Sequence, residues 1–499
     1  MKGSFRWALA SKPDRGLFKI RTHMLLPCLQ NLFIPCTIAG KVKNMAFSRP
    51  MHEMARRNKN RLRLHVPGHK GQALFDAEPV QALDVTELPA TDDLYAPSGP
   101  IVKAQEMMAQ AAGAAHTLML TGGSTAGIHT MLLYSTEPGD TVILPRNAHL
   151  SFMSGCVLAD LNPKYVPLQM TLDGYAYASE EGFLDAIKRH PEARAVVVTR
   201  PDYYGGMVDI ARVAAAAHAK RMRLLVDEAH GAHLPWMESI RSAAFYGADL
   251  WVQSAHKTLP ALTAGALLHL NRREDAQRAL RMLRMVQTSS PAFYLLQSLD
   301  DARAWMEEHG AYALKELRNH LLKFRVRMKA LGYADAHDSW RDLPLEFDPT
   351  RLVIAAPQGG YALAESLRGQ GIDVEMADDR RIVCILTVMD GKETFRRLLS
   401  ALEKASGLPK ASMPPMPCDY PIPRQVMRPR QAALRKQESV ELSRAVGRVS
   451  GTSVGLYPPG IPLITPGEKI TPEAVAILLA APEEKRFGLC GGQLLCTLK

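Results

Sequence analysis

Short apolar runs alternate with helical stretches along the chain from about residue 115 to residue 270. A strand that is buried on both faces reads as a nearly continuous apolar run, so this alternation predicts a mainly parallel sheet with helices on both faces. Ligands of such sheets bind beyond the carboxyl ends of the strands, so the polar residues directly after these runs are the first candidates for chemistry. The predicted strands lie at residues 117–121, 141–145, 195–199, 223–227, 249–253 and 265–270.

The rest of the chain predicts smaller units beside this sheet. Apolar residues at three- and four-residue spacing predict helices over 273–287 and 302–332. Short apolar runs at 352–356, 371–376 and 381–388 predict a smaller α/β unit. We therefore expect a basic, poorly ordered N-terminal extension (1–45), a large domain (46–300), a small α/β domain (301–404), a proline-rich linker (405–430) and a C-terminal subdomain (431–499).

The charge of the chain is concentrated at its beginning. The 499 residues are 47% hydrophobic and carry a formal net charge of +11, which would suggest a nucleic-acid partner if the charge lined one face. Residues 1–45, however, hold eight Lys or Arg residues against one acid, Asp14. The remainder is close to balanced, so we expect no nucleic-acid partner.

The same beginning bears on the compartment of the protein. It is compatible with a targeting peptide, an upstream extension or a misplaced start before Met45, and the sequence leaves these open. Its apolar stretch is interrupted by Pro27 and Pro35, and no other run approaches the about 18 residues of a membrane span. Seven scattered cysteines without a CxxC pair fit free thiols in a reducing compartment. We expect a soluble, cytoplasmic protein without a membrane partner.

A glycine-rich turn follows the first predicted strand. The stretch TGGSTAG leads into a helix, with Gly123, Ser124 and Thr125 at its start. Glycines let the backbone approach a ligand, and the free N–H groups of a helix start attract an anion. The turn lacks the patterns of a nucleotide P-loop and of a dinucleotide site. It therefore predicts a phosphate cradle, although such a turn alone is also an ordinary connector.

The next strand ends carry an imidazole, a carboxylate and an amine. His149 follows the second strand, Asp227 ends the fourth, and Lys257 follows the fifth. A carboxylate at the end of a buried strand is costly unless it meets a cation or a protonated ring nitrogen. Taken separately, His149 could be a structural core histidine, and Asp227 with Lys257 could form a buried ion pair.

One small molecule would use the phosphate cradle, the imidazole, the carboxylate and the amine together. Pyridoxal phosphate (PLP) carries a phosphate, a flat ring, a pyridine nitrogen that functions best when protonated, and an aldehyde that forms an imine with lysine. A zinc site is the weaker alternative: the paired histidines at 65–69 and 230–233 match no HExxH pattern and no CxxC accompanies them. The four groups together predict a PLP site.

Nine stretches of the chain resemble the ornithine/lysine/arginine decarboxylases, particularly their compact bacterial form. Their order along the chain, from about residue 46 to residue 470, makes the resemblance specific. It implies the aspartate-aminotransferase-like fold of PLP enzymes. The matching stretches are HVPGHKG (65–71), ELPATDDLYAPSGPI (87–101), TGGSTAGIHTML (121–132), PRNAHLS (145–151), PDYYG (201–205), VDEAHGAH (226–233), SAHK (254–257), QTSSPAF (287–293) and YPPGIPLITPGE (457–468).

The resemblance implies a role for each candidate residue. It implies that Lys257 forms the imine with the cofactor, that Asp227 pairs with its ring nitrogen and that His149 stacks on its ring. Lys257 or His256 would return a proton to the substrate's Cα, which completes the catalytic set. The remaining cofactor candidates are Gly123, Ser124, Thr125, Ser254 and His256 around the phosphate or the imine, His230 near the cofactor's hydroxyl, and Thr288 and Ser289 for a neighbouring subunit's pocket.

The resemblance also sets the expected reaction and partners. It implies that a basic amino acid loses its α-carboxylate as CO2, with arginine or lysine favoured over ornithine, as a step of polyamine biosynthesis. Candidate partners for the substrate's basic side chain are Asp93, with its neighbour Asp92, Glu375 and Glu468, each of which could equally be an ordinary surface acid. We expect a homodimer or higher homo-oligomer with sites at the subunit interface. An aminotransferase, another lyase, or a homologue that binds PLP without turnover is the alternative.

Overall fold

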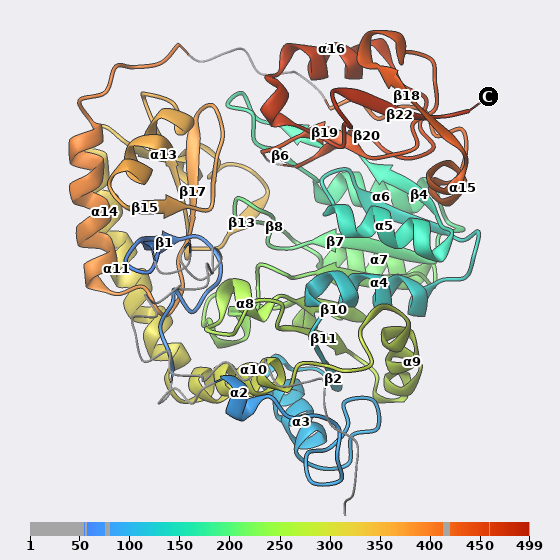
Figure 1. The fold of residues 1–499 in the computed structure, drawn as a ribbon, viewed down its shortest axis with the longest axis horizontal. Coiled ribbons are helices and arrows are strands. Elements are labelled where there is room, and N and C mark those ends of the chain that lie inside the picture. Colours follow the sequence, from blue (N-terminus) through green and yellow to red (C-terminus); the bar gives the residue numbers. More distant parts are fainter. Residues whose placement is uncertain (1–53, 55–56, 75–79, 413–419, 459, 499) are drawn as a thin grey trace, which may run out of the picture. The chain divides into compact units, whose positions relative to one another are not determined.

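The computed structural model describes residues 54, 57–74, 80–412, 420–458 and 460–498. The described residues from Asn58 onward form one compact unit (Figure 1). The expectation of a poorly ordered extension at 1–45 lies outside the described residues.

A seven-stranded sheet forms the centre of this unit. The strand order is β2-β11-β10-β9-β7-β3-β4, and β11 runs antiparallel to its two neighbours while the others are parallel. All six predicted strands are confirmed as members of this sheet. The strands are β2 (His116–Leu120), β3 (Thr141–Pro145), β4 (Asn162–Val166), β7 (Ala195–Thr199), β9 (Arg223–Asp227), β10 (Leu250–Gln253) and β11 (Ala266–Leu270).

Helices cover both faces of the central sheet. On one face α4 (Gly123–Ser135), α5 (Leu150–Ala159) and α9 (Ala276–Val286) share a core with Val197 of β7. On the other, α6 (Glu180–Arg189) and α7 (Ala211–Ala219) pack with its neighbour Val198. Successive side chains of a strand point to opposite faces, so each run of apolar residues supplies both cores. The α/β class with a mainly parallel, doubly covered sheet is confirmed.

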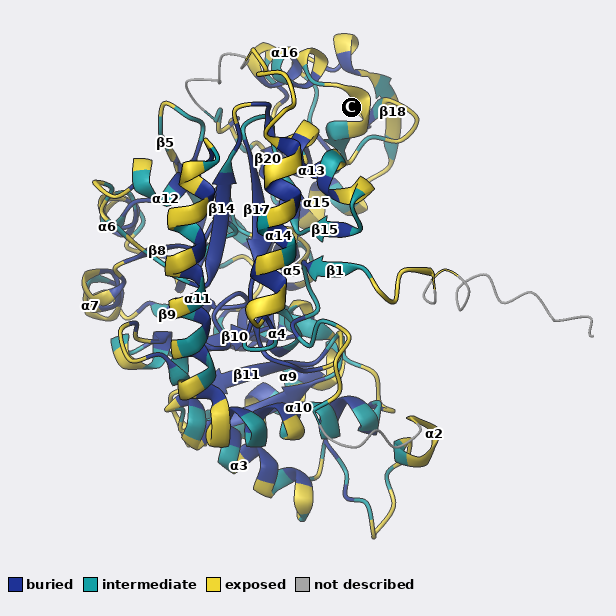
Figure 2. Ribbon diagram, turned by 90° about the vertical axis from the view of Figure 1, so that its left-hand side faces the viewer, coloured by how far each residue is buried: buried dark blue, intermediate teal, exposed yellow. Residues whose placement is uncertain are grey.

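A second sheet of four short antiparallel strands has the order β12-β14-β17-β16. Helices α11 and α14 flank it, with buried sides toward the strands and exposed sides outward (Figure 2). Strand β1, near the beginning of the described chain, pairs in parallel with β15 beside this sheet. The bounds are β1 (Leu62–Leu64), β12 (Ala334–Asp335), β14 (Arg351–Ala355), β15 (Ile372–Val374), β16 (Met376–Ala377), β17 (Arg381–Ile385), α11 (Ala311–Ala330), α13 (Gly360–Gly369) and α14 (Lys392–Ala405).

The helix predicted over 302–332 differs in detail. The helical path begins earlier, with α10 (Phe293–Trp305), and passes through a π-helical segment at Met306–Gly310 before α11. The buried residues Leu299, Met306 and Leu314 belong to one core, so the apolar spacing continues through the π segment. Apolar spacing alone therefore does not reveal that segment.

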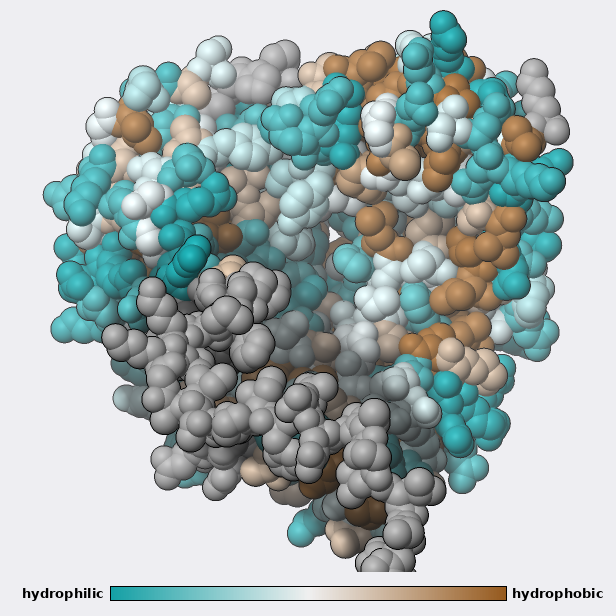
Figure 3. All heavy atoms as spheres, viewed as in Figure 1, coloured by the Kyte–Doolittle hydropathy of each residue, from teal (hydrophilic) through white to brown (hydrophobic). Residues whose placement is uncertain are grey.

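The chain ends in small sheets with a core of their own, in which Leu463, Leu478 and Leu494 are buried. The elements are α15 (Pro429–Leu434), β18 (Gln437–Glu441), β19 (Val454–Leu456), β20 (Pro462–Ile464), α16 (Pro472–Ala480), β21 (Arg486–Phe487) and β22 (Gln493–Thr497). Hydrophobic residues also gather on the surface near α5 and α15 (Figure 3), where Leu158 and Leu434 are exposed. In the described part of the chain, no helix is both long and apolar enough to cross a bilayer.

Candidate active site

One cavity of about 340 Å³ opens at the carboxyl ends of the central strands. Ser124 after β2, His149 after β3, Asp227 at the end of β9 and Lys257 after β10 all line it, together with His230. The volume lies within the roughly 300–1,000 Å³ of small-molecule sites. The cradle, imidazole, carboxylate and amine of the sequence analysis therefore face one space.

Asp227 is the buried acid of this cavity, with 3% of its surface exposed. Its Oδ1 accepts a hydrogen bond from the backbone N–H of Ala229 at 3.1 Å. Burial raises the pKa of Asp227, while the nearby His149 and Lys257 oppose this rise. A carboxylate in this position gains most from a cationic partner inside the cavity.

His149 both lines the cavity and caps a helix. As the residue before α5, it accepts a hydrogen bond from the backbone N–H of Ser151 at Nδ1, and the same nitrogen lies 2.7 Å from Ser151 Oγ. Burial lowers the pKa of His149, which favours a neutral ring. These contacts hold a flat, uncharged imidazole at the cavity wall.

Lys257 lies on the short helix α8 (Ala255–Thr258) that follows β10. Its Nζ is 3.1 Å from His230 Nε2. Burial lowers the pKa of Lys257, and although Asp227 and Glu375 oppose this, the net direction is downward. A lysine whose pKa is lowered by burial is a better nucleophile toward a carbonyl carbon.

The loop of the HVPGHKG stretch is hydrogen-bonded to the backbone of α8. Gly68 N–H donates to the carbonyl oxygen of His256 at 2.7 Å, and Thr387 Oγ1 donates to the carbonyl oxygen of Gly68 at 2.8 Å. A Cβ atom at position 68 would lie 2.4 Å from the carbonyl oxygen of Leu259, so only glycine fits. The backbone around Lys257 is therefore held by a segment about 190 positions earlier in the chain.

The glycine-rich turn forms a helix start without a side-chain cap. Helix α4 begins at Gly123, which has φ +69°, and its N-cap is Gly122. Ser124 lines the cavity, whereas Thr125 is exposed and does not. The hydroxyl of Thr121 beside the turn is buried and has no hydrogen-bond partner among the described residues. These features suit an anionic group at the helix start.

Ser254 and His256 lie next to this cradle. Gly123 N–H donates to Ala264 O at 2.9 Å and His256 N–H to Gly265 O at 3.2 Å, which brings the two segments together. The ring of His256 is fixed by contacts of Nδ1 with Gly265 O at 3.0 Å and with Ser254 Oγ at 3.3 Å. Both residues stay candidates for the phosphate region.

Glu375 reaches the cavity from the loop after β15, as the sequence analysis allowed. Its Oε1 accepts a hydrogen bond from Tyr203 Oη at 2.6 Å, and its Oε2 accepts one from the backbone N–H of Val66 at 3.0 Å. These donors orient a carboxylate toward the same space that holds Lys257.

Asp93, Thr288 and Ser289 are not among the residues that line the cavity in the described structure. Asp93 Oδ1 accepts a hydrogen bond from Tyr95 N–H at 2.8 Å within its own loop. Thr288 and Ser289 are exposed, and the hydroxyl of Tyr95 donates to the carbonyl oxygen of Thr288. A role in a neighbouring subunit's pocket stays a prediction.

Asp92 accepts four backbone N–H bonds, from residues 93, 98, 99 and 101, and so organises the loop that also holds Asp93.

Glu468 forms a buried ion pair with Arg146. Its two carboxylate oxygens lie 2.7 and 2.9 Å from the guanidinium nitrogens of Arg146, and Thr465 N–H donates to Oε2 at 2.7 Å. Only 1% of Glu468 is exposed, and it is not among the cavity-lining residues. Its carboxylate is already paired with Arg146 and Thr465 within the fold, which argues against a contact with the substrate.

Removing the charge of Glu468 is therefore expected to affect stability rather than substrate binding. Breaking a buried pair by removing one partner costs about 3–5 kcal/mol, so Glu468→Gln should lower the free energy of unfolding by roughly this amount. Denaturant unfolding measures it. The control is Glu438→Gln, which loses an exposed pair with Arg448 and should change stability by less than about 1 kcal/mol. A stable Glu468→Gln variant with a raised KM would contradict this assignment.

Aromatic side chains that the sequence analysis did not single out form much of the cavity wall. They are Tyr203, Tyr204, Tyr420 and Tyr457. Two of them belong to the PDYYG stretch, which was quoted for the resemblance without a role. The repeated tyrosine directly after a predicted strand end was the available signal.

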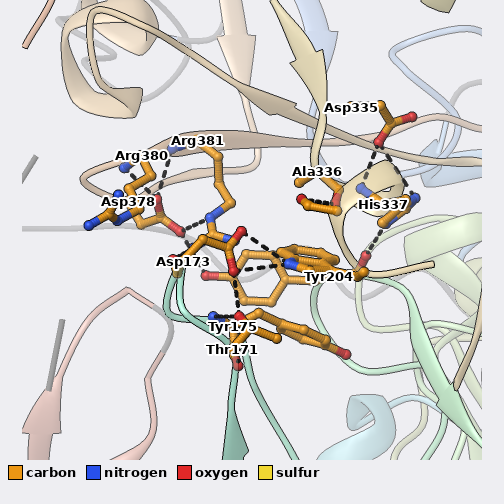
Figure 4. A network of polar contacts seen from close by, with 12 residues as sticks. Thr171, Asp173, Tyr175, Tyr204, Asp335, Ala336, His337, Asp378, Arg380 and Arg381 are labelled. Carbon is orange, nitrogen blue, oxygen red and sulfur yellow. Dashed lines mark hydrogen bonds and ion pairs between the residues drawn. The ribbon is translucent and has the colours of Figure 1, made fainter. Parts of the chain in front are cut away.

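A polar network fixes Tyr204 between the two sheets (Figure 4). Tyr204 Oη donates to Asp378 at 3.0 Å, and its carbonyl oxygen lies 2.9 Å from His337 Nε2. Arg381 pairs with the same Asp378 at 3.0 Å and with Asp173 at 3.1 Å. The cavity wall is thereby tied to the four-stranded sheet.

The residues present fit PLP. The cavity joins a lysine with a lowered pKa, a buried acid, a neutral imidazole and an uncapped helix start. These are the groups needed for an aldehyde, a pyridine nitrogen, an aromatic ring and a phosphate. Among the described residues, no cluster of His, Cys, Asp and Glu is arranged to hold a metal ion.

Solved structures with the same fold include decarboxylases and aminotransferases. The lysine decarboxylase LdcF of Francisella novicida has a TM-score of 0.70 at 19% identity, covering 81% of this chain and 72% of that one. An alanine–glyoxylate aminotransferase of Nostoc has a TM-score of 0.53 at 16% identity, covering 69% and 95%. At these identities the likeness shows the fold.

Sequence comparison defines the family within this fold class. The sequence pattern of the family described as "Orn/Lys/Arg decarboxylase, major domain" matches residues 49–349, and that of its C-terminal domain matches residues 417–485. The arginine decarboxylase of Bacillus subtilis is 31% identical over 443 residues, covering 84% of this chain and 90% of that protein. The uncharacterised protein YaaO of the same organism is 34% identical over 449 residues, covering 87% and 93%. This chain belongs to the Orn/Lys/Arg decarboxylase family, as the resemblance implied.

Proposed function

We propose that this protein is a PLP-dependent decarboxylase of a basic amino acid. The observation that carries the proposal is the single cavity in which Lys257, Asp227, His149 and the start of α4 meet. Membership of a decarboxylase family supports the reaction class.

PLP, when bound, supplies an electron sink for the bond that breaks at Cα. Lys257 would hold the aldehyde through its amine, Asp227 would keep the ring nitrogen protonated, and His149 would lie against the ring. Helix α4 would hold the phosphate with its N–H groups and Ser124. The protein's own contribution is to position these groups and to exclude water from a largely buried cavity.

The proton that replaces CO2 at Cα must come from a group in the cavity. Lys257 lines the cavity and His256 is not among its lining residues. His256 is also held away by its bond to Gly265 O. These placements support Lys257 as the donor, with His256 as the alternative.

Glu375 is the proposed partner of the substrate's distal positive charge. Its carboxylate faces the cavity, and its two present donors leave further acceptor positions free. The neighbouring tyrosines offer an apolar wall for an aliphatic stem. Arginine or lysine is the proposed substrate, with ornithine as the shorter alternative.

Glu375→Gln tests this assignment. A hydrogen bond to a charged group is worth roughly 1.5–3 kcal/mol, so KM for the preferred amino acid should rise about 10- to 100-fold with a small change in kcat. Steady-state kinetics measures both constants. Glu468→Gln, which also removes one acid, is the matched control and should leave KM unchanged. An unchanged KM in Glu375→Gln would show that another group recognises the substrate.

The reaction itself is tested with purified protein, PLP and arginine, lysine and ornithine in separate assays. Product amines are identified by mass, and CO2 is measured. Formation of an amine with CO2 supports the proposal. A keto acid in place of CO2 would indicate an aminotransferase, and turnover of none of the three would refute the substrate class.

We also propose a cytoplasmic homodimer that acts in polyamine biosynthesis. The exposed apolar residues near α5 and α15 are compatible with a subunit contact. Light scattering on the purified protein measures the oligomeric state, and a monomer that turns over substrate would contradict a shared site involving Thr288 and Ser289.

A further inference from the structure

Three nitrogen-bearing side chains, of which Arg351 and His230 are buried, form a row that joins the four-stranded sheet to the cavity. Arg351 is the first residue of β14, and its Nη2 lies 3.2 Å from Nδ1 of His230. Nε2 of His230 lies 3.1 Å from Nζ of Lys257. Arg351 is 1% exposed and His230 is 7% exposed, so the contact between them is shielded from water, whereas Lys257 is partly exposed toward the cavity.

The ring of His230 is held in place from a further side. Tyr203 packs against it edge to face, with ring centroids 5.3 Å apart. Tyr203 is itself fixed by its hydrogen bond to Glu375. The two nitrogens of His230 therefore keep their separate partners.

The chemistry of the row permits one arrangement of protons. A guanidinium only donates hydrogen bonds and is always charged, so Nδ1 of His230 must accept from Arg351. A neutral imidazole carries its single proton on the other nitrogen, so Nε2 is the donor toward Lys257. An ammonium group has no lone pair with which to accept, so the lysine partner of this donor is the neutral amine.

We propose that Arg351 is a positioning residue: it fixes the proton of His230 on Nε2 and thereby holds the amine of Lys257 in its unprotonated, reactive form. Its importance for catalysis rests on the proposed function, because that function needs Lys257 to attack the cofactor's aldehyde. The proton arrangement itself does not depend on the cofactor.

The charged groups around the row favour this state. Burial lowers the pKa of His230 well below its usual value, and the pKa of Lys257 is lowered by burial and by Arg351. The titratable and charged groups that face His230 and Lys257 are Asp227 and Glu375, which favour positive charge, and Arg351, His149 and His256, which oppose it.

A structural ion pair does not account for Arg351. Asp202 and Asp348 lie close enough for Arg351 to lower the pKa of each, yet the described structure contains no ion pair of Arg351 with either. Asp202 accepts from Tyr175 Oη at 2.6 Å, and Asp348 is engaged by His233 and Thr350. The Nε and Nη1 atoms of Arg351 have no hydrogen-bond partner in the described residues.

The first test measures the position of the proton in the unmodified chain. Nitrogen-15 NMR of the full-length, histidine-labelled protein without PLP distinguishes a protonated from an unprotonated ring nitrogen, and His230→Gln assigns the signals. We expect an unprotonated Nδ1 and a protonated Nε2. A proton on Nδ1, or a doubly protonated ring at neutral pH, would overturn the proposal without the need for an Arg351 variant.

The second test measures the protonation of Lys257 through its reaction with PLP. The full chain is mixed with PLP across a range of pH, trapped with borohydride, and the fraction modified at Lys257 is read by mass. Arg351→Met removes the donor and the charge, so the midpoint should move upward by about one pH unit, which is about tenfold less neutral amine below the midpoint. Arg351→Lys keeps a charged donor and should retain most of the wild-type profile.

The outcomes separate the two proposals. An unchanged midpoint in folded Arg351→Met would refute the role of Arg351 while leaving the decarboxylase proposal intact. If the wild-type chain attaches no PLP at any pH, the proposed function fails, and the NMR measurement still decides the proton arrangement. If Arg351→Met does not fold, the NMR result on the unmodified chain decides alone.

Discussion

Lys257→Ala should reduce decarboxylation on the order of 10³-fold or more, and borohydride should no longer attach PLP to the chain. The reason is that Lys257 is the amine placed by α8 in the cavity with a lowered pKa, and the loss of a reacting nucleophile has effects of this size. Product formation and the mass of the trapped protein measure the two effects.

An exposed lysine provides the control for this experiment. Lys188 is an exposed residue of α6 and is not among the residues that line the cavity. Lys188→Ala should therefore leave both product formation and the mass of the trapped protein unchanged. Turnover by Lys257→Ala at a rate near that of the wild type would remove the basis of the proposed chemistry.

Asp227→Asn should lower kcat about 10²- to 10³-fold with a smaller change in KM. Asparagine keeps the size of the side chain and can still accept from Ala229 N–H, but it carries no negative charge to keep a ring nitrogen protonated. One preorganised electrostatic group is typically worth about 2.7–4 kcal/mol in the transition state. Steady-state kinetics with PLP in excess measures both constants.

The stability of the same variant gives an independent check. Burial raises the pKa of Asp227 above its value in the unfolded chain, so ionised Asp227 costs stability as pH rises through this range. At neutral pH, Asp227→Asn without PLP should therefore unfold no more easily than the wild type. A drop in kcat without a drop in stability separates a chemical role from a structural one.

The neighbouring acid is a matched control for Asp227. Glu228 is fully buried, but its carboxylate accepts from Gln253 Nε2 and Ala243 N–H, both at 2.7 Å, and does not line the cavity. Glu228→Gln should keep kcat within a few-fold and affect mainly stability. An equal loss of kcat in both variants would argue that the fold, rather than the charge of Asp227, is what matters.

The central sheet was predictable because each of its buried strands is a short apolar run that is followed by polar or glycine residues. Lys257 and Asp227 could be assigned to the same edge of the sheet for the same reason, since Asp227 is the last residue of β9 and Lys257 comes four positions after β10. Strand β4 was missed because Pro163 and Lys164 interrupt its apolar pattern, and a proline is tolerated there at the edge of the sheet.

The candidate partners of the substrate could not be told apart from the sequence, because their surroundings depend on long-range contacts that no local pattern predicts. Glu375 and Glu468 were equal candidates in the sequence, and only the fold shows that Glu468 meets Arg146, which is 322 positions away. Arg351 is likewise an ordinary basic residue before an apolar run, and its contact with His230 spans 121 positions. Such pairings are decided by how the sheets pack against each other.

Strand β1 and the loop after it limit how far the protein can be shortened from its N-terminal side. Strand β1 is anchored at β15, and the loop behind it carries Gly68 to the backbone of α8. A shortened protein that starts after residue 71 would still contain the turn at Gly123, Asp227 and Lys257. Helix α8, which carries Lys257, would however lose its hydrogen bond from Gly68. A shortened protein should therefore begin no later than Asn58, which lies more than sixty positions ahead of Gly123 at the start of α4.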